Sequence, residues 1–470
     1  MTTETTWTDV LRGQFDPAWL SLPVGIAAAA AVLVYAPVEA DMARMLAITV
    51  FSISLWVGAP VAPWLTGLLA VGLVGASFST DLALTGFQSA ATWLVVLGIL
   101  LGEATRQSGL ASAVERAALG VLPGDAATNA KTTYRNLLVV LCVAALGFVV
   151  LVPSSLVRVL ILGPILISIG KRFSDRSARV GLFLGPLFVT YYAGTGILTG
   201  SLANIIINGL LEANAGVSIG WMEWAVWLGP VMGVGRAAVI TVIAYALYRP
   251  ADADAIDVSD DSEHGTEAAS EARRMMAFLL VGVAIWATDS VHGLHPLYGA
   301  LVVTVLAFTP RVGVVGADAV ENANFSIVFF LGAIFAIAAG LQQTGFTDVA
   351  ADAILASFPQ DASLSVALAF LALASLALTF LMEGLAVASV LTPVLVAFAE
   401  SAGLPLYPVM MTEAVALNSY FFPYQSAVLV AILGLDVVDS MELIKMAALC
   451  SLATLLVLLP IQIGIFALAF

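Results

Sequence analysis

The sequence predicts an all-α polytopic membrane protein, built as an inverted repeat with two re-entrant helical hairpins and two broken transmembrane helices. Three observations predict this class. The chain of 470 residues is 61% hydrophobic and 10% charged, whereas soluble domains are about half apolar and about a quarter charged. Short motifs recur in the same order in both halves, and basic residues flank corresponding segments of the two halves unequally.

The hydrophobic residues form long runs, as in 22–37, 137–152 and 448–470. A helix needs about 20 mostly apolar residues to cross about 30 Å of hydrocarbon, so these runs predict membrane-spanning helices. Residues 1–17 contain no basic segment followed by an apolar core and a cleavage site. We therefore expect no cleaved signal peptide, and we assign these residues to an N-terminal cytoplasmic tail.

The repeat is visible in three pairs of motifs. SSLVRVLILGPI (154–165) and EGLAVASVLTPV (383–394) share leucine at the third and ninth positions and proline at the eleventh. The other two pairs flank this one in the same order, namely QSGL (107–110) with QTGF (343–346), and GTGILTGSLAN (194–204) with NSYFFPYQSAVL (418–429). We interpret the preserved order as a duplication.

The first transmembrane repeat is expected at 18–248. Its elements in chain order are spans near 18–36, 43–58, 61–77 and 90–121, a hairpin at 136–170, a broken helix at 180–214 and a span at 222–248. The hairpin arms are short for full spans and are joined directly at 153–155. A re-entrant hairpin therefore fits this segment better than two spans.

The second, inverted transmembrane repeat is expected at 275–470. Its elements are spans near 275–290 and 296–309, an apolar region at 325–356, a hairpin at 363–399, a broken helix at 408–434 and a span at 443–469. The hairpin turns at 382–384, and the broken helix is interrupted at 423–425. Both features match the first repeat in order.

An acidic cytoplasmic linker is expected at 249–274, between the repeats. The acidic residues of the chain are most concentrated at 252–272, and the net charge of the whole chain is −15, which argues against nucleic acid as a partner. The segment is too polar to bury. A flexible linker and a strongly hydrated surface from a halophilic source are compatible interpretations of its composition.

Basic residues predict the orientation of the two hairpins. Lys131 and Arg135 precede the first hairpin, and a cluster of Lys171, Arg172, Arg176 and Arg179 follows it. The flanks of the second hairpin, near 357–362 and 400–406, contain no lysine or arginine. Positive loops stay in the cytoplasm, so the hairpins are expected to enter from opposite sides, as an inverted repeat requires.

The glycine-rich break at 194–204 indicates a solute site. Irregular backbone at membrane depth persists only when it is buried in protein or lines a wet cavity. Glycines expose carbonyl groups there, and Thr195, Thr199, Ser201 and Asn204 add hydroxyls and an amide. Carbonyl and hydroxyl oxygens suit Na⁺, whereas amide donors and helix N-termini suit an anion. Close helix packing through small residues is the alternative.

Several charged residues lie inside apolar segments. An arginine at the bilayer centre costs roughly 2.5–3.5 kcal/mol on insertion scales. We therefore expect Arg158 and Glu383 to face a central cavity, with Arg158 attracting an anion; the alternative is that each snorkels or pairs locally. The roles of Arg236, Glu413 and the Glu103/Arg106 pair stay open at this point. No metal cluster or catalytic set is apparent, and Cys142 and Cys450 are expected to be buried thiols.

At these motifs the chain resembles the divalent anion:sodium symporter family of the ion transporter superfamily. That family carries Ser-Asn-Thr at each hairpin tip, about ten residues before a proline. Here 154–156 and 383–385 occupy the two places, before Pro164 and Pro393. Gly200 to Asn204 and Pro423 to Ser426 take the positions of the family motifs in the broken helices.

The resemblance implies two sodium sites and an anion site between them. The first sodium site would use Ser154, Ser155, Gly196, Gly200 and Asn204, and the second Glu383, Gly384, Gln425 and Ser426. By the resemblance, the anion would contact Ser155, Ser201 and Ser426. We add Arg158 and Asn204 as further candidate anion ligands. Neither Ser-Asn-Thr signature is intact, so the amide and threonine hydroxyl that hold a carboxylate are missing, and Arg158 would compensate with a fixed positive charge. Homodimers and an elevator motion are further implications.

The expected function is secondary active transport that couples Na⁺ to a small anion, either a dicarboxylate or an oxyanion such as sulfate. Sodium/proton antiport and metalloid-anion efflux are the alternatives, and a passive channel is a third. We expect no enzyme and no cofactor beyond Na⁺ as the coupling ion. The expected location is the plasma membrane of a halophilic prokaryote, as a multi-pass protein.

Overall fold

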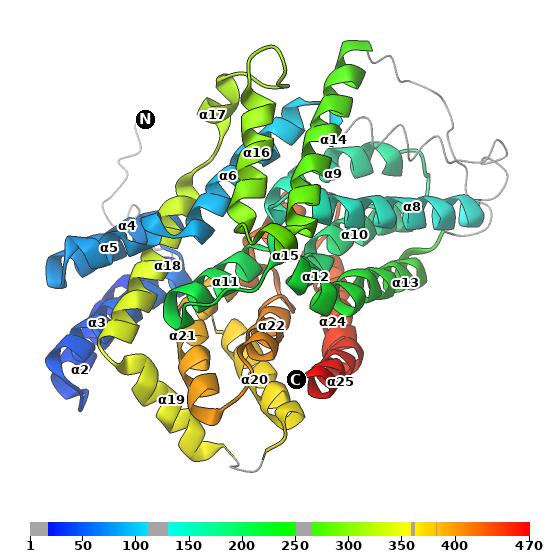
Figure 1. Cartoon of the computed structure of the whole chain (residues 1–470). Helices are drawn as coiled ribbons and strands as arrows, with labels where there is room; N and C mark the ends of the chain where they lie inside the picture. The colour runs from blue at the N-terminus through cyan, green and yellow to red at the C-terminus, as the bar shows by residue number, and fades with distance from the viewer. Residues whose placement is uncertain (1–16, 111–129, 251–265, 359–361, 382) are drawn as a thin grey trace, which may run out of the picture.

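The computed structural model describes residues 17–110, 130–250, 266–358, 362–381 and 383–470 (Figure 1). Nearly all of the expected tail at 1–17 and most of the acidic linker at 249–274 lie outside these ranges, as does Met382. Within them, every regular element is helical and no strand occurs. Seven helices are long and apolar enough to cross a membrane, or eight if the bent pair Thr80–Gln88 and Ala90–Gln107 is one span. The prediction of an all-α polytopic membrane protein is confirmed.

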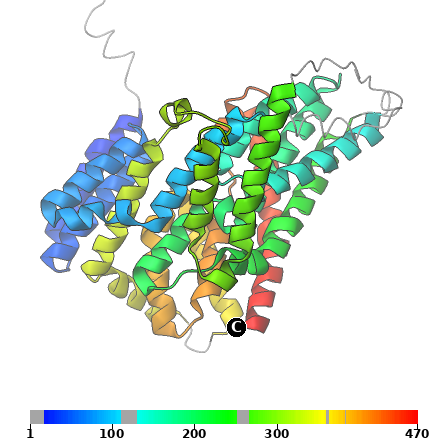
Figure 2. The ribbon, with the colours of Figure 1, turned by 45° about the horizontal axis from the view of Figure 1, so that its top comes forward.

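One group of helices lies to one side of the molecule (Figures 1 and 2). It consists of α2 (Ser21–Tyr35), α3 (Ala40–Gly58), α4 (Pro63–Ser77), α5 (Thr80–Gln88) and α18 (Ser326–Gln343). Glycines bring α18 close to its neighbours. A Cβ on Gly67 would lie 2.6 Å from the carbonyl oxygen of Phe329, and one on Gly86 2.5 Å from that of Gly332. We call this group the lateral unit.

Further helices are α6 (Ala90–Gln107), α14 (Thr266–Ala287), α16 (Pro296–Phe308) and α19 (Phe346–Ser357), with the short elements η1 (Pro17–Leu20), α15 (Asp289–His292) and α17 (Asp318–Asn322). Helix α16 packs on α6 and α14, α19 packs on α21, and η1 packs on α2 of the lateral unit. The apolar region expected at 325–356 is therefore two helices, α18 and α19. The sequence pair QSGL and QTGF has one structural role: Gly109 and Gly345 follow α6 and α18 with φ of 70° and 77°, a left-handed conformation that ends a helix and favours glycine.

The hairpins and broken helices form a second group, which we call the central unit. The first half supplies α8 (Ala130–Leu151), α9 (Ser155–Gly170), α10 (Arg176–Tyr192), η3 (Ala193–Gly196), η4 (Leu198–Gly200) and α11 (Leu202–Ala215). The second half supplies α20 (Leu364–Thr379), α21 (Gly384–Ala402), α22 (Leu406–Leu417), η6 (Pro423–Gln425) and α23 (Ala427–Leu433). The two broken helices, α10 to α11 and α22 to α23, are interrupted within the expected segments. The second break begins at Asn418, five residues before the expected Pro423.

Corresponding elements of the two halves make corresponding contacts. Helix α10 packs on α8 and α9, and α22 packs on α20 and α21. The halves also cross: α9 packs on α23, and α21 packs on α11. Each hairpin thus contacts the broken helix of the other half. That the hairpins end inside the bilayer stays a prediction.

The last span of each half contains a π-helical segment that the sequence did not predict. The first runs through α12 (Trp221–Leu228), η5 (Gly229–Gly235) and α13 (Arg236–Tyr248), and the second through α24 (Ser440–Ala453), η7 (Thr454–Leu458) and α25 (Leu459–Ala469). Pro230 lies within η5, and Pro460 lies in α25, just after η7. A proline has no N–H to donate to the carbonyl four residues earlier, which disturbs the helix at this point. The segments η5 and η7 contact each other.

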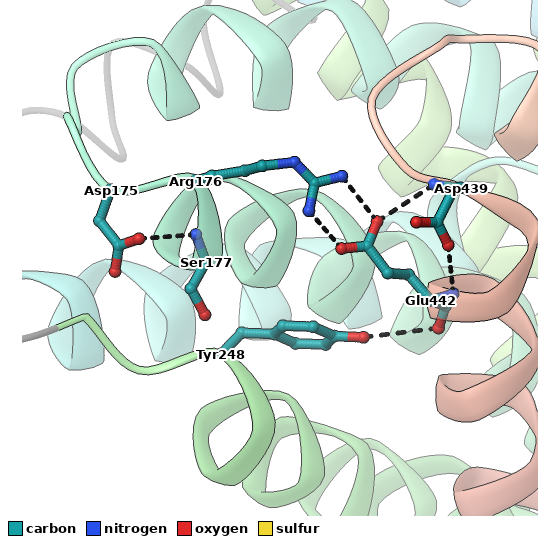
Figure 3. A network of polar contacts seen from close by, with 6 residues as sticks. All are labelled: Asp175, Arg176, Ser177, Tyr248, Asp439 and Glu442. Atoms are coloured by element: carbon teal, nitrogen blue, oxygen red, sulfur yellow. Dashed lines mark hydrogen bonds and ion pairs between the residues drawn. The ribbon is translucent and has the colours of Figure 1, made fainter.

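A polar network joins the two halves where α10, α13 and α24 meet (Figure 3). Arg176 binds the Glu442 carboxylate with two nitrogens, one of them at 3.0 Å. Asp439 and Glu442 form a capping box at the start of α24, and the Tyr248 hydroxyl donates to the Glu442 carbonyl at 3.4 Å.

Replacing Arg176 by glutamine should lower stability by less than replacing Asp439 by alanine. The Arg176 side chain is 63% exposed, and an exposed ion pair contributes about 0–1 kcal/mol, whereas losing an N-cap costs about 1 kcal/mol. Thermal unfolding of the purified protein measures both changes. A larger loss for the arginine variant would mean that the bridge between the halves matters more than the cap.

Candidate functional site

The two helix breaks lie against each other and are joined by Asn418, the residue that follows α22. Its amide nitrogen donates to the Asn204 side-chain oxygen at 3.3 Å, and its side-chain oxygen accepts from the Ser201 hydroxyl at 2.9 Å. All three side chains are buried. Ser201 and Asn204 were predicted site residues, whereas Asn418 was not. The breaks therefore form a single polar centre between the halves.

Arg158 lies in the first turn of α9, with no exposed surface. Its guanidinium donates to three carbonyl oxygens, those of Val152 at 2.6 Å, Gly200 at 2.6 Å and Thr190 at 2.8 Å. It also donates to the hydroxyls of Thr190 at 2.9 Å and Ser155 at 3.0 Å. We expected Arg158 to face a cavity. In the structure it instead joins the first hairpin to the first break, which is the local pairing that was its alternative.

The residues predicted for the first sodium site surround this guanidinium or hold the nearby backbone. Ser155 and Gly200 both bind Arg158, and the Ser155 hydroxyl also donates to the Gly200 carbonyl at 3.2 Å. Ser154 caps α9 through its hydroxyl. Its φ of 96° is uncommon for a residue other than glycine, and such strain tends to occur at functional sites.

Asn204 and the glycines determine the shape of the first break. The Asn204 amide nitrogen lies 2.9–3.2 Å from the carbonyl oxygens of Gly194, Thr195 and Ile197. A Cβ on Gly200 would lie 2.5 Å from the Gly194 oxygen, and one on Gly196 2.5 Å from the Gly233 nitrogen in η5. These glycines permit close backbone packing, which was the alternative to a ligand role.

The residues predicted for the second sodium site connect the second hairpin to the second break. The Gln425 amide donates to the Thr379 carbonyl at 2.9 Å, and its oxygen accepts from the N–H of Phe421 and Phe422. Tyr424 also donates to the carbonyl of Phe380 in the hairpin turn, at 3.1 Å.

The remaining three members of this set lie at helix starts. Glu383 caps α21 by accepting from the N–H of Leu385 at 2.9 Å. Ser426 caps α23 and accepts a hydrogen bond from the Tyr191 hydroxyl. A Cβ on Gly384 would lie 3.5 Å from the Tyr420 hydroxyl, so this end of the hairpin is close to the second break.

Arg236 is a second buried arginine at the centre, and its role was left open by the sequence. It donates to the Tyr192 carbonyl and Thr195 hydroxyl in the first half, both at 3.1 Å. It also donates to the Asn418 carbonyl at 2.8 Å and the Ser419 hydroxyl at 3.3 Å in the second half. Arg236 thus joins both breaks. The Glu103/Arg106 pair differs, because these two residues bind each other at the end of α6.

Neither buried arginine has an acidic partner among the residues that the structure describes. A buried charge without a counter-ion is unfavourable, so two guanidinium groups held only by carbonyls, hydroxyls and, for Arg236, the ring of Tyr192 at 5.0 Å favour an anion nearby. The sequence could locate Arg236 only as a charge in an apolar span.

A tyrosine cluster completes the centre. Tyr191 and Tyr420 stack with ring centroids 5.4 Å apart, and the Tyr192 hydroxyl donates to the Tyr420 carbonyl at 3.0 Å. The Ser451 hydroxyl of α24 donates to the same carbonyl at 2.6 Å. These three tyrosines were not predicted as site residues, although each lies next to a predicted break.

Two interlocked broken helices, each contacted by a hairpin, and two buried arginines without acidic partners among the described residues define a polytopic membrane transporter of small anions. Residues 18–466 match the family model described as "Sodium:sulfate symporter transmembrane region". The chain belongs to this family, whose members are membrane transporters and not enzymes.

Relatives support this assignment. The L-tartrate/succinate antiporter of Escherichia coli K12 is 22% identical over 414 residues, covering 83% of this chain and 81% of the antiporter. A membrane protein of Cupriavidus necator is 25% identical over 301 residues, which span 58% of this chain and only 56% of that protein. The solved structure of the Alcanivorax borkumensis YdaH transporter has the same fold, with a TM-score of 0.59 and 14% identity, covering 92% of this chain and 99% of that one.

Proposed function

We propose that this protein is a secondary active transporter of a small dicarboxylate-like dianion, in which Arg158 is a fixed cation at the place where the first sodium ion was expected. The observation that carries the proposal is the set of oxygens around its guanidinium. Three carbonyls and two hydroxyls from the hairpin tip and the broken helix are the kind of oxygens that unwound helices offer to Na⁺.

A sodium ion would compete with Arg158 for these oxygens. Two unit charges about 4 Å apart repel by roughly 4 kcal/mol at the effective dielectric constant of a protein. The first half would therefore contribute its positive charge without binding Na⁺. Any sodium coupling would use the second half, where Glu383, Gly384, Gln425 and Ser426 are the proposed ligands.

The charge of the centre favours a dianion as the substrate. Arg158 and Arg236 supply two positive charges that have no acidic partners in the described part of the chain. The polar groups that would contact the solute come from Ser155, Ser201, Asn204, Asn418 and Ser426. The name of the E. coli relative includes two dicarboxylates, and that of the family includes sulfate. A dicarboxylate is the first candidate and sulfate the second.

The division into a lateral unit and a central unit supports an elevator motion of one against the other. A homodimer joined through the lateral unit, in the plasma membrane, completes the proposal. Sodium-coupled symport is the second candidate mechanism, and the presence of Glu383 at the second hairpin favours it.

Uptake into proteoliposomes tests the proposal. Liposomes preloaded with succinate should take up labelled succinate or tartrate by exchange in Na⁺-free buffer, faster than empty liposomes. Sulfate should compete more weakly, and an inward Na⁺ gradient should add little. Uptake that requires Na⁺ and is indifferent to preloading would favour symport, and failure of every anion would contradict the proposal.

A further inference from the structure

Glu413 is a buried acid that takes no part in the centre described above. It lies in α22 with no exposed surface. Its Oε1 accepts a hydrogen bond from the Thr392 hydroxyl of α21 at 2.9 Å, and its Oε2 has no partner among the described residues. None of the described basic side chains forms an ion pair with it. This carboxylate is therefore unpaired in an apolar interior.

An unpaired buried carboxylate is neutralised either by a proton or by a cation, because leaving its charge unpaired in such a place costs several kcal/mol. A hard metal ion needs about six oxygen ligands. Among the described residues, Thr392 gives Glu413 its only side-chain hydrogen bond, and there is no cluster of three or more acidic, histidine or cysteine ligands. A proton needs only the carboxylate. We propose that Glu413 is a proton-binding site that links proton movement to the second hairpin.

Thr392 can serve both protonation states. A threonine hydroxyl donates one hydrogen bond and accepts others. When Glu413 is ionised, the hydroxyl donates to the carboxylate. When Glu413 is protonated, the acid donates to the hydroxyl, which can turn to a carbonyl three or four residues earlier in its helix. Pro393 has no N–H for the carbonyl of Ser389, so an acceptor is free three residues before Thr392.

The position of Glu413 connects it to the centre through two helices. Helix α21 begins at the tip of the second hairpin, and α22 is followed directly by Asn418, which joins both breaks. Proton binding changes the contact between these two helices. We infer that one proton moves in the same direction as each anion, so that acid outside drives net uptake in addition to the exchange proposed above. This inference rests on the proposed function.

Few other titratable groups lie on the helices that pack against α22. These helices are α11, α20, α21 and α25, and α20 and α25 carry none. Helix α21 carries Glu400, with Glu383 at its N-cap, and α11 carries Glu212, which pairs with His295 at 3.8 Å. None of them is hydrogen-bonded to Glu413, so the variants below separate their contributions.

The test uses the full chain in liposomes that contain a pH-sensitive dye, with succinate as the probe. Wild type should accumulate succinate several-fold under an acid-outside gradient, and the dye should report proton entry. Glu413→Gln, which has the same shape but binds no proton, should lose both responses. Glu400→Gln, which removes an exposed acid from the partner helix, is the matched control and should keep both.

A second variant and a second measurement keep the test decisive. Thr392→Val removes the hydroxyl and should shift the pH at which uptake is half-maximal. Infrared difference spectra of the detergent-purified protein during a pH titration should show a carboxylic acid band that Glu413→Gln lacks. Retention of the pH response by Glu413→Gln, or an unchanged acid band, would overturn the inference. If wild type moves no anion, the proposed function fails. The infrared titration still shows whether Glu413 binds a proton.

Discussion

Replacing Arg158 by serine is expected to reduce anion transport by roughly a hundredfold in Na⁺-free buffer, and high Na⁺ is expected to restore part of it. The substitution removes the Arg158 donors from the carbonyls of Val152 and Thr190 and leaves the Gly200 carbonyl with only the Ser155 hydroxyl. An orphaned buried acceptor costs about 1–3 kcal/mol, and each 1.4 kcal/mol corresponds to a factor of about ten. The vacated oxygens can bind Na⁺, which returns the missing charge.

The measurement is succinate exchange in proteoliposomes at several Na⁺ concentrations, with choline as the replacement cation. Arg158→Lys should also lose activity, because one ammonium group cannot supply the planar set of donors that the oxygens need. Arg106→Ser is the control, since Arg106 is exposed and binds only its neighbours in α6. Normal Na⁺-free exchange by Arg158→Ser would show that no fixed cation is needed there.

Replacing Asn418 by alanine is expected to lower exchange by about tenfold to a hundredfold. The substitution leaves the Asn204 oxygen and the Ser201 hydroxyl without their partners in the other half, and each such loss costs about 1–3 kcal/mol. Asn418→Asp should be at least as damaging, because it puts a negative charge where an anion is proposed to bind.

Asn214→Ala is the matched control for this substitution. Among the described residues, the Asn214 side chain forms one hydrogen bond, from its amide nitrogen to the carbonyl of Leu210 in its own helix at 2.7 Å. Exchange rates should be compared at equal amounts of folded protein, judged by size-exclusion chromatography. Equal rates for the two alanine variants would show that Asn418 has no special part in joining the breaks.

The sequence predicted the fold and both breaks because these depend on local signals. Apolar runs identify spans, and the glycines in QSGL and QTGF end helices in the same way in both halves. The direction in which Arg158 points could not be predicted. Its partners are mostly backbone carbonyls freed by irregular structure, and such atoms are present at every position of every sequence.

The contacts of Arg236 and the presence of the π-helical segments could not be predicted from the sequence, for a related reason. Residues 222–248 have the composition of an ordinary span, and the widened turn at η5 is visible only in three dimensions. Arg236 then reaches a carbonyl of Asn418, nearly two hundred residues later in the chain. Long-range contacts of this kind depend on how the halves cross, which no local pattern records.

Because elements of the first half pack on elements of the second half, this protein can complete its folding only late in synthesis. Proteins are made from the N-terminus, and early segments usually fold first. Here the first hairpin needs α23 as a neighbour, and Arg236 needs Asn418, so neither can reach its final surroundings until the ribosome has delivered most of the second half. The first half therefore has incomplete contacts in the membrane until the second half is inserted.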